Sequence, residues 1–125
     1  MTETDHVLVV EDDDGIRDLL AYKLRTSDYE VTAIDDGADC LEALEEGELE
    51  PDAVVLDVML PGVDGYEVLE RLREHARLAD VPVIMVTGMG LEANVVRGFE
   101  AGADDYVTKP FSPSELVARL GRLCR

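Results

Sequence analysis

An aliphatic run followed directly by consecutive acidic residues is the feature that most constrains the fold of this chain. Val7–Val10 contains only valine and leucine, and Glu11, Asp12 and Asp13 follow it directly. A short apolar run without polar alternation is typical of a strand in a parallel sheet whose two faces are both covered by helices. The acids would then lie at the carboxyl edge of the sheet, where open α/β sheets bind their ligands.

The same pattern recurs three times further along the chain. Three predominantly apolar runs each end in one polar residue, and they are Val54–Leu56 before Asp57, Val83–Val86 before Thr87 and Tyr106–Thr108 before Lys109. A more alternating segment, Tyr29–Ile34, predicts a strand nearer the sheet edge.

Segments with helical spacing of apolar residues separate these runs. They are Asp14–Leu24 (with Ile16, Leu19, Leu20 and Leu24 as one apolar stripe), Ala38–Glu46, Asp64–Leu72, Leu91–Ala101 and Ser112–Cys124. The last segment starts with a serine cap, a proline at the first helical position and a glutamate three residues after the cap. Five strands alternating with five helices predict an α/β fold with a parallel sheet and helices on both faces.

Length and charge narrow the classes of function. The 125 residues fit one domain spanning 1–125, and a net charge of −18 argues against direct nucleic-acid binding. The acidity is compatible with life in high salt, with ordinary solubility or with a basic partner. No apolar stretch approaches the roughly 20 residues of a membrane span. The polar, acidic N-terminus is unlike a signal peptide, so we expect a cytoplasmic protein that does not bind membranes.

The polar residues that end the strands should meet at one edge of the sheet. Glu11, Asp12 and Asp57 would bring three carboxylates together, and two unit charges about 4 Å apart repel by about 4 kcal/mol at an effective dielectric near 20. Hard oxygen ligands with no histidine or cysteine nearby favour Mg²⁺. Lys109 adds an ammonium and Thr87 a hydroxyl, which predicts a site for a phosphoryl group carried on a carboxylate.

Together these motifs resemble the receiver domains of two-component response regulators. The segments that carry the resemblance are Val9–Asp13, Val54–Gly65, Met85–Gly88 and Tyr106–Phe111, and the match runs from about His6 to Arg122. The resemblance implies a flavodoxin-like (βα)5 fold with strand order 2-1-3-4-5. It also implies that Asp57 accepts a phosphoryl group from a sensor histidine kinase or a phosphotransfer protein.

The resemblance also assigns the metal site residue by residue. Glu11 and Asp12 match the family's acidic pair, with Asp12 as the direct ligand, and Asp57 and the backbone carbonyl of Met59 complete the Mg²⁺ ligands. Capping of the first helix is the structural alternative for the acidic pair, and a strand-end turn is the alternative for Asp57. Asp13 is interpreted as a helix-start charge rather than a ligand.

On the phosphoryl side, Thr87 would rotate onto a phosphoryl oxygen, Tyr106 would turn inward behind it and Lys109 would pair with the phosphoryl group. The structural alternatives are that Thr87 only terminates its strand, that Tyr106 is a core aromatic residue and that Lys109 is an ion-pair partner of the acids. The resemblance implies a cis peptide bond before Pro110. The resemblance also implies that Met59 and Met89 flank the pocket, where their apolar bulk would restrict water access and slow the loss of the phosphoryl group.

The likeness is closest to the subfamily whose effector is a winged-helix DNA-binding domain. It rests on Asp104–Tyr106 and Pro113–Arg119. Of the three cross-dimer ion pairs in that subfamily, Asp105 and Arg119 match one. The other two are incomplete, because Val95 would face Glu115 and Glu100 would face Gly121. We therefore expect a monomer or a phosphorylation-dependent dimer that signals to an effector domain or a downstream protein.

An aspartyl-phosphate phosphatase and an unphosphorylated pseudo-receiver are the alternatives to this switch. An aspartyl-phosphate phosphatase of the haloacid-dehalogenase type needs a second acid two residues after its nucleophile, whereas Val58 and Met59 follow Asp57. An unphosphorylated pseudo-receiver would act as an interaction module, and the intact acidic pocket disfavours it. We expect phosphoacceptor chemistry on the chain itself rather than an enzyme with an external substrate.

Overall fold

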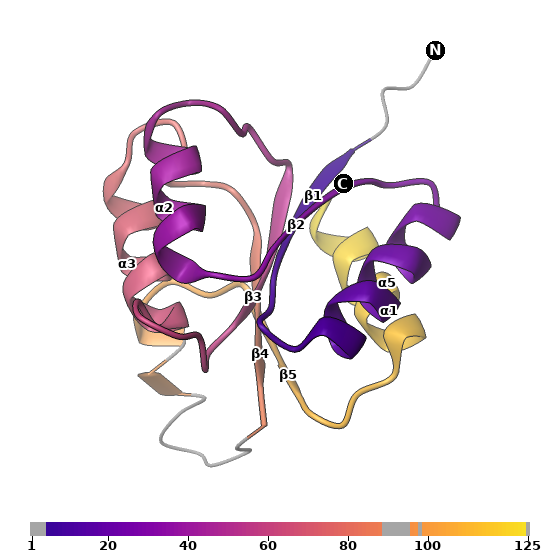
Figure 1. The fold of residues 1–125 in the computed structure, drawn as a ribbon. Coiled ribbons are helices and arrows are strands. Elements are labelled where there is room, and N and C mark those ends of the chain that lie inside the picture. The colour runs from indigo at the N-terminus through magenta and orange to yellow at the C-terminus, as the bar shows by residue number, and fades with distance from the viewer. Residues whose placement is uncertain (1–4, 89–95, 98, 125) are drawn as a thin grey trace.

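The computed structural model describes residues 5–88, 96–97 and 99–124 of the chain. Its elements in chain order are β1 (His6–Val10), α1 (Asp14–Thr26), β2 (Glu30–Ile34), α2 (Gly37–Glu45), β3 (Ala53–Asp57), α3 (Gly65–Glu74), β4 (Val83–Thr87), β5 (Asp105–Thr108) and α5 (Pro113–Leu123) (Figure 1). Most of the predicted helix Leu91–Ala101, including Val95, lies outside the described residues, and so does Met89.

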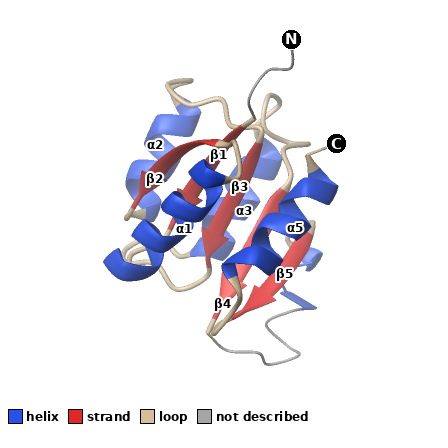
Figure 2. Ribbon diagram, turned by 90° about the vertical axis from the view of Figure 1, so that its right-hand side faces the viewer, coloured by secondary structure: helices blue, strands red, loops and turns tan. Residues whose placement is uncertain are grey.

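The strands form one parallel sheet in the order β2-β1-β3-β4-β5, which confirms the predicted topology. Helices α1 and α5 contact each other on one face, and α2 and α3 contact each other on the opposite face (Figures 1 and 2). Val10 of β1 is level with Leu56 of β3. The residues that follow these two, Glu11 and Asp57, are therefore neighbours at the carboxyl edge.

The core has two layers because alternate residues of each buried strand point to opposite faces. On β1, Leu8 and Val10 pack toward α2 and α3, whereas Val7 and Val9 pack toward α1 and α5. Within the predicted apolar stripe of α1, Leu19 does not face the core, because it is 52% exposed. Ala21 is buried beside Leu20 and Leu24 instead, so the apolar face of α1 is rotated away from Leu19.

Side-chain caps start all four described helices, and the serine cap of α5 was predicted from the sequence; Asp36 caps α2. Asp13 accepts a hydrogen bond from the Ile16 amide, which confirms its role at the start of α1. Asp64 caps α3, and Ser112 caps α5. Cys40 and Cys124 are free thiols. Among the described residues, no helix combines the length and apolar character that a membrane crossing requires.

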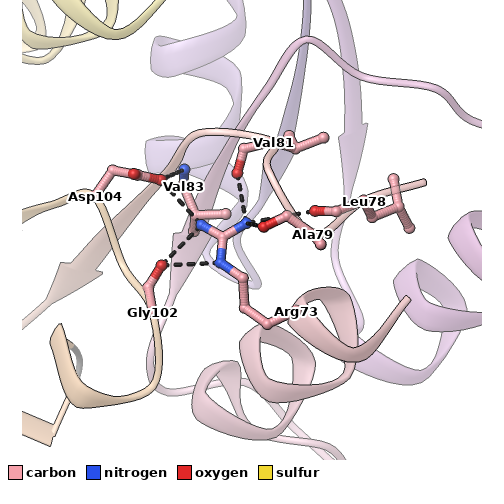
Figure 3. A network of polar contacts seen from close by, with 7 residues as sticks. All are labelled: Arg73, Leu78, Ala79, Val81, Val83, Gly102 and Asp104. Carbon is pink, nitrogen blue, oxygen red and sulfur yellow. Dashed lines mark hydrogen bonds and ion pairs between the residues drawn. The ribbon is translucent and has the colours of Figure 1, made fainter. Parts of the chain in front are cut away.

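Arg73, in the last turn of α3, joins two connections at the amino edge of the sheet (Figure 3). Its Nε and one terminal nitrogen donate to the Gly102 carbonyl at 2.9 and 2.8 Å, and the same terminal nitrogen lies 3.0 Å from Asp104 Oδ2. The other terminal nitrogen donates to carbonyls of the α3–β4 connection, with Val81 closest at 2.7 Å. Asp104 Oδ2 also accepts from the Val83 amide at 2.8 Å, so one guanidinium ties together α3, the start of β4 and the approach to β5.

Candidate functional site

Three carboxylates meet at the carboxyl edge, as predicted. Oxygen atoms of Glu11, Asp12 and Asp57 lie within 4.8 Å of one another, with Glu11 and Asp57 buried and Asp12 exposed. The Glu11 amide donates to the Ile34 carbonyl of β2, and Glu11 Oε2 accepts from the Asp13 amide at 3.2 Å. These bonds hold Glu11 at the strand end while leaving its Oε1 directed at the cluster.

Lys109 places one ammonium between the two buried acids. Its Nζ lies 2.8 Å from Glu11 Oε1 and 3.0 Å from Asp57 Oδ2. Its backbone is fixed by a hydrogen bond of 2.6 Å from the Lys109 amide to the Thr87 carbonyl, and the Lys109–Pro110 bond is cis as expected. The sequence prediction that Lys109 reaches the acidic cluster is confirmed.

The ionisation of these groups reflects burial and mutual contact. Burial raises the pKa of Glu11, and the neighbouring Asp57 carboxyl group adds to this against the lowering effect of Lys109. Burial by itself would lower the pKa of Lys109, but the hydrogen bonds to Glu11 and Asp57 outweigh it and the pKa is raised. With all four side chains ionised, three carboxylates face one ammonium.

The residues present therefore fit a divalent cation. The cluster supplies hard oxygen donors, and its excess of negative charge equals the charge of one such ion. Two of its acids are almost fully buried, where uncompensated charge is costly. The donor set and its charge agree with the Mg²⁺ predicted from the sequence.

The backbone after β3 holds the Asp57 carboxylate in place. Asp57 Oδ1 accepts from the Met59 amide at 3.1 Å, and the Gly65 amide donates to the Val58 carbonyl at 2.9 Å. Gly62 in this loop has a φ of +77°, a backbone conformation that glycine adopts without steric cost. The Met59 side chain is 64% exposed, so its backbone is the part that contacts the acceptor.

Thr87 and Tyr106 occupy the neighbouring strands. Thr87 is buried at the end of β4, one residue beyond Val86, which is level with Asp57 of β3. Tyr106 is half-buried, and its hydroxyl lies 2.9 Å from the hydroxyl of Tyr66 in α3. Tyr66 is a site residue that no sequence motif indicated. A tyrosine directly after the cap and first glycine of a helix carries no local sign that it will reach another strand.

An apolar cavity of about 350 Å³ opens beside the acidic cluster. Its lining comes from α1, the end of β4 and the β5–α5 connection, namely Ile16, Leu19, Gly88, Lys109, Pro110 and Phe111. The exposed Leu19 side chain thus belongs to a surface next to the site. No local sequence pattern predicts this cavity, because residues from three separate segments assemble it.

The predicted dimer pair is engaged within the chain. Arg119 donates to both carboxylate oxygens of Asp105 at 3.0 and 2.9 Å, and to Glu115 at 3.1 Å. A contact across a dimer would have to compete with these bonds. The cross-dimer pairing stays a prediction.

The fold and the site define a doubly wound α/β protein with an acidic, lysine-containing site at the carboxyl edge of its sheet. The chain belongs to the response regulator receiver domain family, whose family model matches residues 7–121. It is therefore a receiver domain of two-component systems.

Curated relatives agree with this assignment. The chain is 46% identical over 125 residues to the transcriptional regulatory protein CseB of Streptomyces avermitilis, covering 100% of this chain and 51% of the relative. It is 44% identical over 119 residues to the dual master transcriptional regulator RpaA of Synechocystis, covering 95% and 48%. The chain thus spans about half the length of these relatives, whose names as transcriptional regulators agree with the subfamily resemblance.

Solved structures show the same fold. A putative response regulator from Chloroflexus aurantiacus superposes with a TM-score of 0.91 at 38% identity, covering 98% of both chains. The receiver domain of a sensor histidine kinase from Pseudomonas aeruginosa, solved with a magnesium ion in its active-site cleft, has a TM-score of 0.88 at 30% identity and covers 98% of both chains.

Proposed function

We propose that this chain accepts a phosphoryl group on Asp57 from a histidine kinase or a phosphotransfer protein, and thereby changes how the face formed by β5 and α5 binds its partners. The observation that carries the proposal is the buried Asp57 carboxylate, 3.0 Å from Lys109 Nζ inside the acidic cluster. A buried acid held by an ammonium and a backbone amide has a fixed orientation, which phosphoryl transfer requires of its acceptor.

In the proposed reaction, an Asp57 carboxylate oxygen attacks the phosphorus of a phosphohistidine. A P–O bond forms, the P–N bond breaks, and its electron pair leaves with the imidazole. The Met59 amide and Lys109 orient the carboxylate, and the ammonium offsets charge on the phosphoryl oxygens. Thr87 is the hydroxyl proposed to contact the transferred group.

Glu11, Asp12, Asp57 and the Met59 carbonyl are the proposed ligands of Mg²⁺. When bound, the cation supplies charge neutralisation to the phosphoryl oxygens. The chain's own contribution is to bring buried and exposed carboxylates to one point by the register of β1 and β3. The chemistry stays on Asp57, so no external substrate is turned over.

The apolar cavity beside Lys109 supports docking of the phosphoryl donor. Leu19 and Tyr22 are exposed on the same helix, at 52% and 68%, and Leu19 lines the cavity. Exposed apolar groups next to a site are typical of a protein-binding surface. Because the curated relatives are about twice as long, an effector domain is proposed as the recipient of the signal.

Incubation with phosphoramidate and Mg²⁺ is expected to add about 80 Da to the intact mass, the mass of one phosphoryl group. Asp57→Asn should abolish the adduct, and chelation of Mg²⁺ should suppress it. Asp80→Asn is the matched control, because Asp80 is exposed and precedes β4 at the opposite edge of the sheet. Equal incorporation into wild type and Asp57→Asn would contradict the proposal.

Mg²⁺ is also expected to stabilise the fold. A ligand at a hundred times its dissociation constant adds about 2.7 kcal/mol to the free energy of unfolding. The unfolding midpoint should therefore rise with Mg²⁺ at constant ionic strength. Asp12→Asn should remove most of this rise, and Asp12 is exposed, so the substitution spares the core. An undiminished rise in Asp12→Asn would place the ion elsewhere on the acidic surface.

A further inference from the structure

Two tyrosines form a hydrogen-bonded pair between α3 and β5. The Tyr66 hydroxyl lies 2.9 Å from the Tyr106 hydroxyl, and the Tyr66 side chain is almost fully buried. The guanidinium carbon of Arg97 lies 4.1 Å from the centre of the Tyr66 ring, a cation–π contact. The Tyr106 ring packs against Phe99 with centroids 6.3 Å apart. The pair therefore connects α3 with both β5 and the segment that precedes it.

Tyr66 is also directly connected to the acceptor loop. It follows Gly65, whose amide donates to Val58 and whose α-carbon packs so closely on the Asp57 carbonyl that a side chain there would overlap it. The two ends of the loop from Asp57 to Tyr66 thus contact each other directly at Gly65. A displacement of the backbone at Asp57 is therefore transmitted to the start of α3 through this contact.

The phenol pair favours the observed position of Tyr106. Burial and the bond with Tyr106 raise the pKa of Tyr66, so its hydroxyl stays protonated at neutral pH and available for this bond. If Tyr106 leaves, the buried Tyr66 hydroxyl loses this partner, which is unfavourable. Any movement of Tyr106 away from α3 therefore works against this bond.

We infer that Tyr66 is a positioning residue that couples Asp57 to the β5 face by holding Tyr106 in its unphosphorylated position. The inference rests on the proposed function of Asp57. Phosphorylation displaces the loop that ends at Tyr66, weakens the phenol pair and frees Tyr106 to move. Arg97 links the segment before β5 to the Tyr66–Tyr106 pair through its contact with the Tyr66 ring.

The test uses ring-labelled tyrosine and NMR. The chain has four tyrosines, so single Tyr→Phe variants assign every ring signal. Tyr66→Phe removes one oxygen atom and keeps the buried ring. A hydrogen bond of ordinary net strength shifts a two-state ratio about fivefold. In unphosphorylated Tyr66→Phe, the Tyr106 signal should therefore move part of the way toward its phosphorylated position, and the phosphorylated forms of variant and wild type should coincide.

Two further variants sharpen the test. Tyr22→Phe removes an exposed phenol from α1 and should leave the Tyr106 signal of both forms unchanged. Arg97→Gln removes the cation–π contact with the Tyr66 ring and should move the Tyr106 signal in the same direction as Tyr66→Phe, but by less.

The outcomes separate the two proposals. If wild type incorporates phosphate but the Tyr106 signal is the same in unphosphorylated wild type, Tyr66→Phe and Arg97→Gln, the inference about Tyr66 is wrong and the proposed function stands. If wild type incorporates no phosphate, the proposed function falls and the inference falls with it.

Discussion

Replacement of Arg73 by methionine is expected to lower the free energy of unfolding by about 3 kcal/mol, because several partly buried backbone acceptors lose their donor at once. The Gly102 and Val81 carbonyls each accept from this guanidinium at less than 3 Å, and the Arg73 side chain is only 19% exposed. Methionine keeps most of the apolar stem, so the loss reports on the guanidinium rather than on packing.

Arg71→Met is the matched control for this prediction. Arg71 lies on the same helix, but it makes one ion pair with Glu45 at 2.7 Å, and both side chains are more than 40% exposed. Such a surface pair contributes about 1 kcal/mol or less. Urea denaturation followed by circular dichroism measures both variants. Similar midpoints for Arg73→Met and Arg71→Met would show that the network in Figure 3 adds little stability.

Arg73→Lys separates charge from geometry. Lysine keeps the positive charge but cannot donate to Gly102 and to the α3–β4 connection with one planar fork. Its stability should fall between those of wild type and Arg73→Met. If lysine restored full stability, charge opposite Asp104 rather than the shape of the guanidinium would hold the two connections together.

The sheet and its acidic edge were predictable because both follow from local pattern. Uninterrupted aliphatic runs indicate buried parallel strands, and the residue after each run must emerge at the carboxyl edge. The positions of Glu11, Asp57 and Lys109 follow from this rule without knowledge of the register. The structure adds that β1 and β3 are level at Val10 and Leu56, which decides that the carboxylates actually meet.

The remaining features depend on contacts between segments far apart in the chain. Helical spacing admits Leu19 to the apolar stripe of α1, and only the packing of that helix on the sheet shows that Ala21 is buried in its stead. In the sequence, Arg73 is indistinguishable from the other basic residues of a charged helix, and Tyr66 is indistinguishable from an ordinary core aromatic residue. Their partners lie 29 to 40 residues away at Gly102 and Tyr106. The residue pattern along one helix cannot predict contacts with residues so far away in the sequence.

Gly65→Ala is expected to disrupt the site more than any other substitution of equal size. The added Cβ would overlap the Asp57 carbonyl oxygen and come within 2.9 Å of the Val58 α-carbon, and neither backbone atom can rotate aside. Relief requires α3 to move away from the acceptor loop and breaks the bond from the Gly65 amide to Val58. We expect a loss of about 3 kcal/mol in the free energy of unfolding, and at least tenfold slower phosphoryl incorporation.

The matched control is Gly121→Ala in α5, where no other atom lies within 4 Å of the added Cβ. Alanine in a helix interior is favoured over glycine by about 0.5–1 kcal/mol, so this variant should gain stability and keep wild-type incorporation. The same methyl group therefore has opposite effects at the two positions. Normal incorporation by a stable Gly65→Ala protein would mean that the acceptor loop tolerates a displaced α3, and the close contact between Asp57 and the start of α3 would then play no part in transmitting phosphorylation.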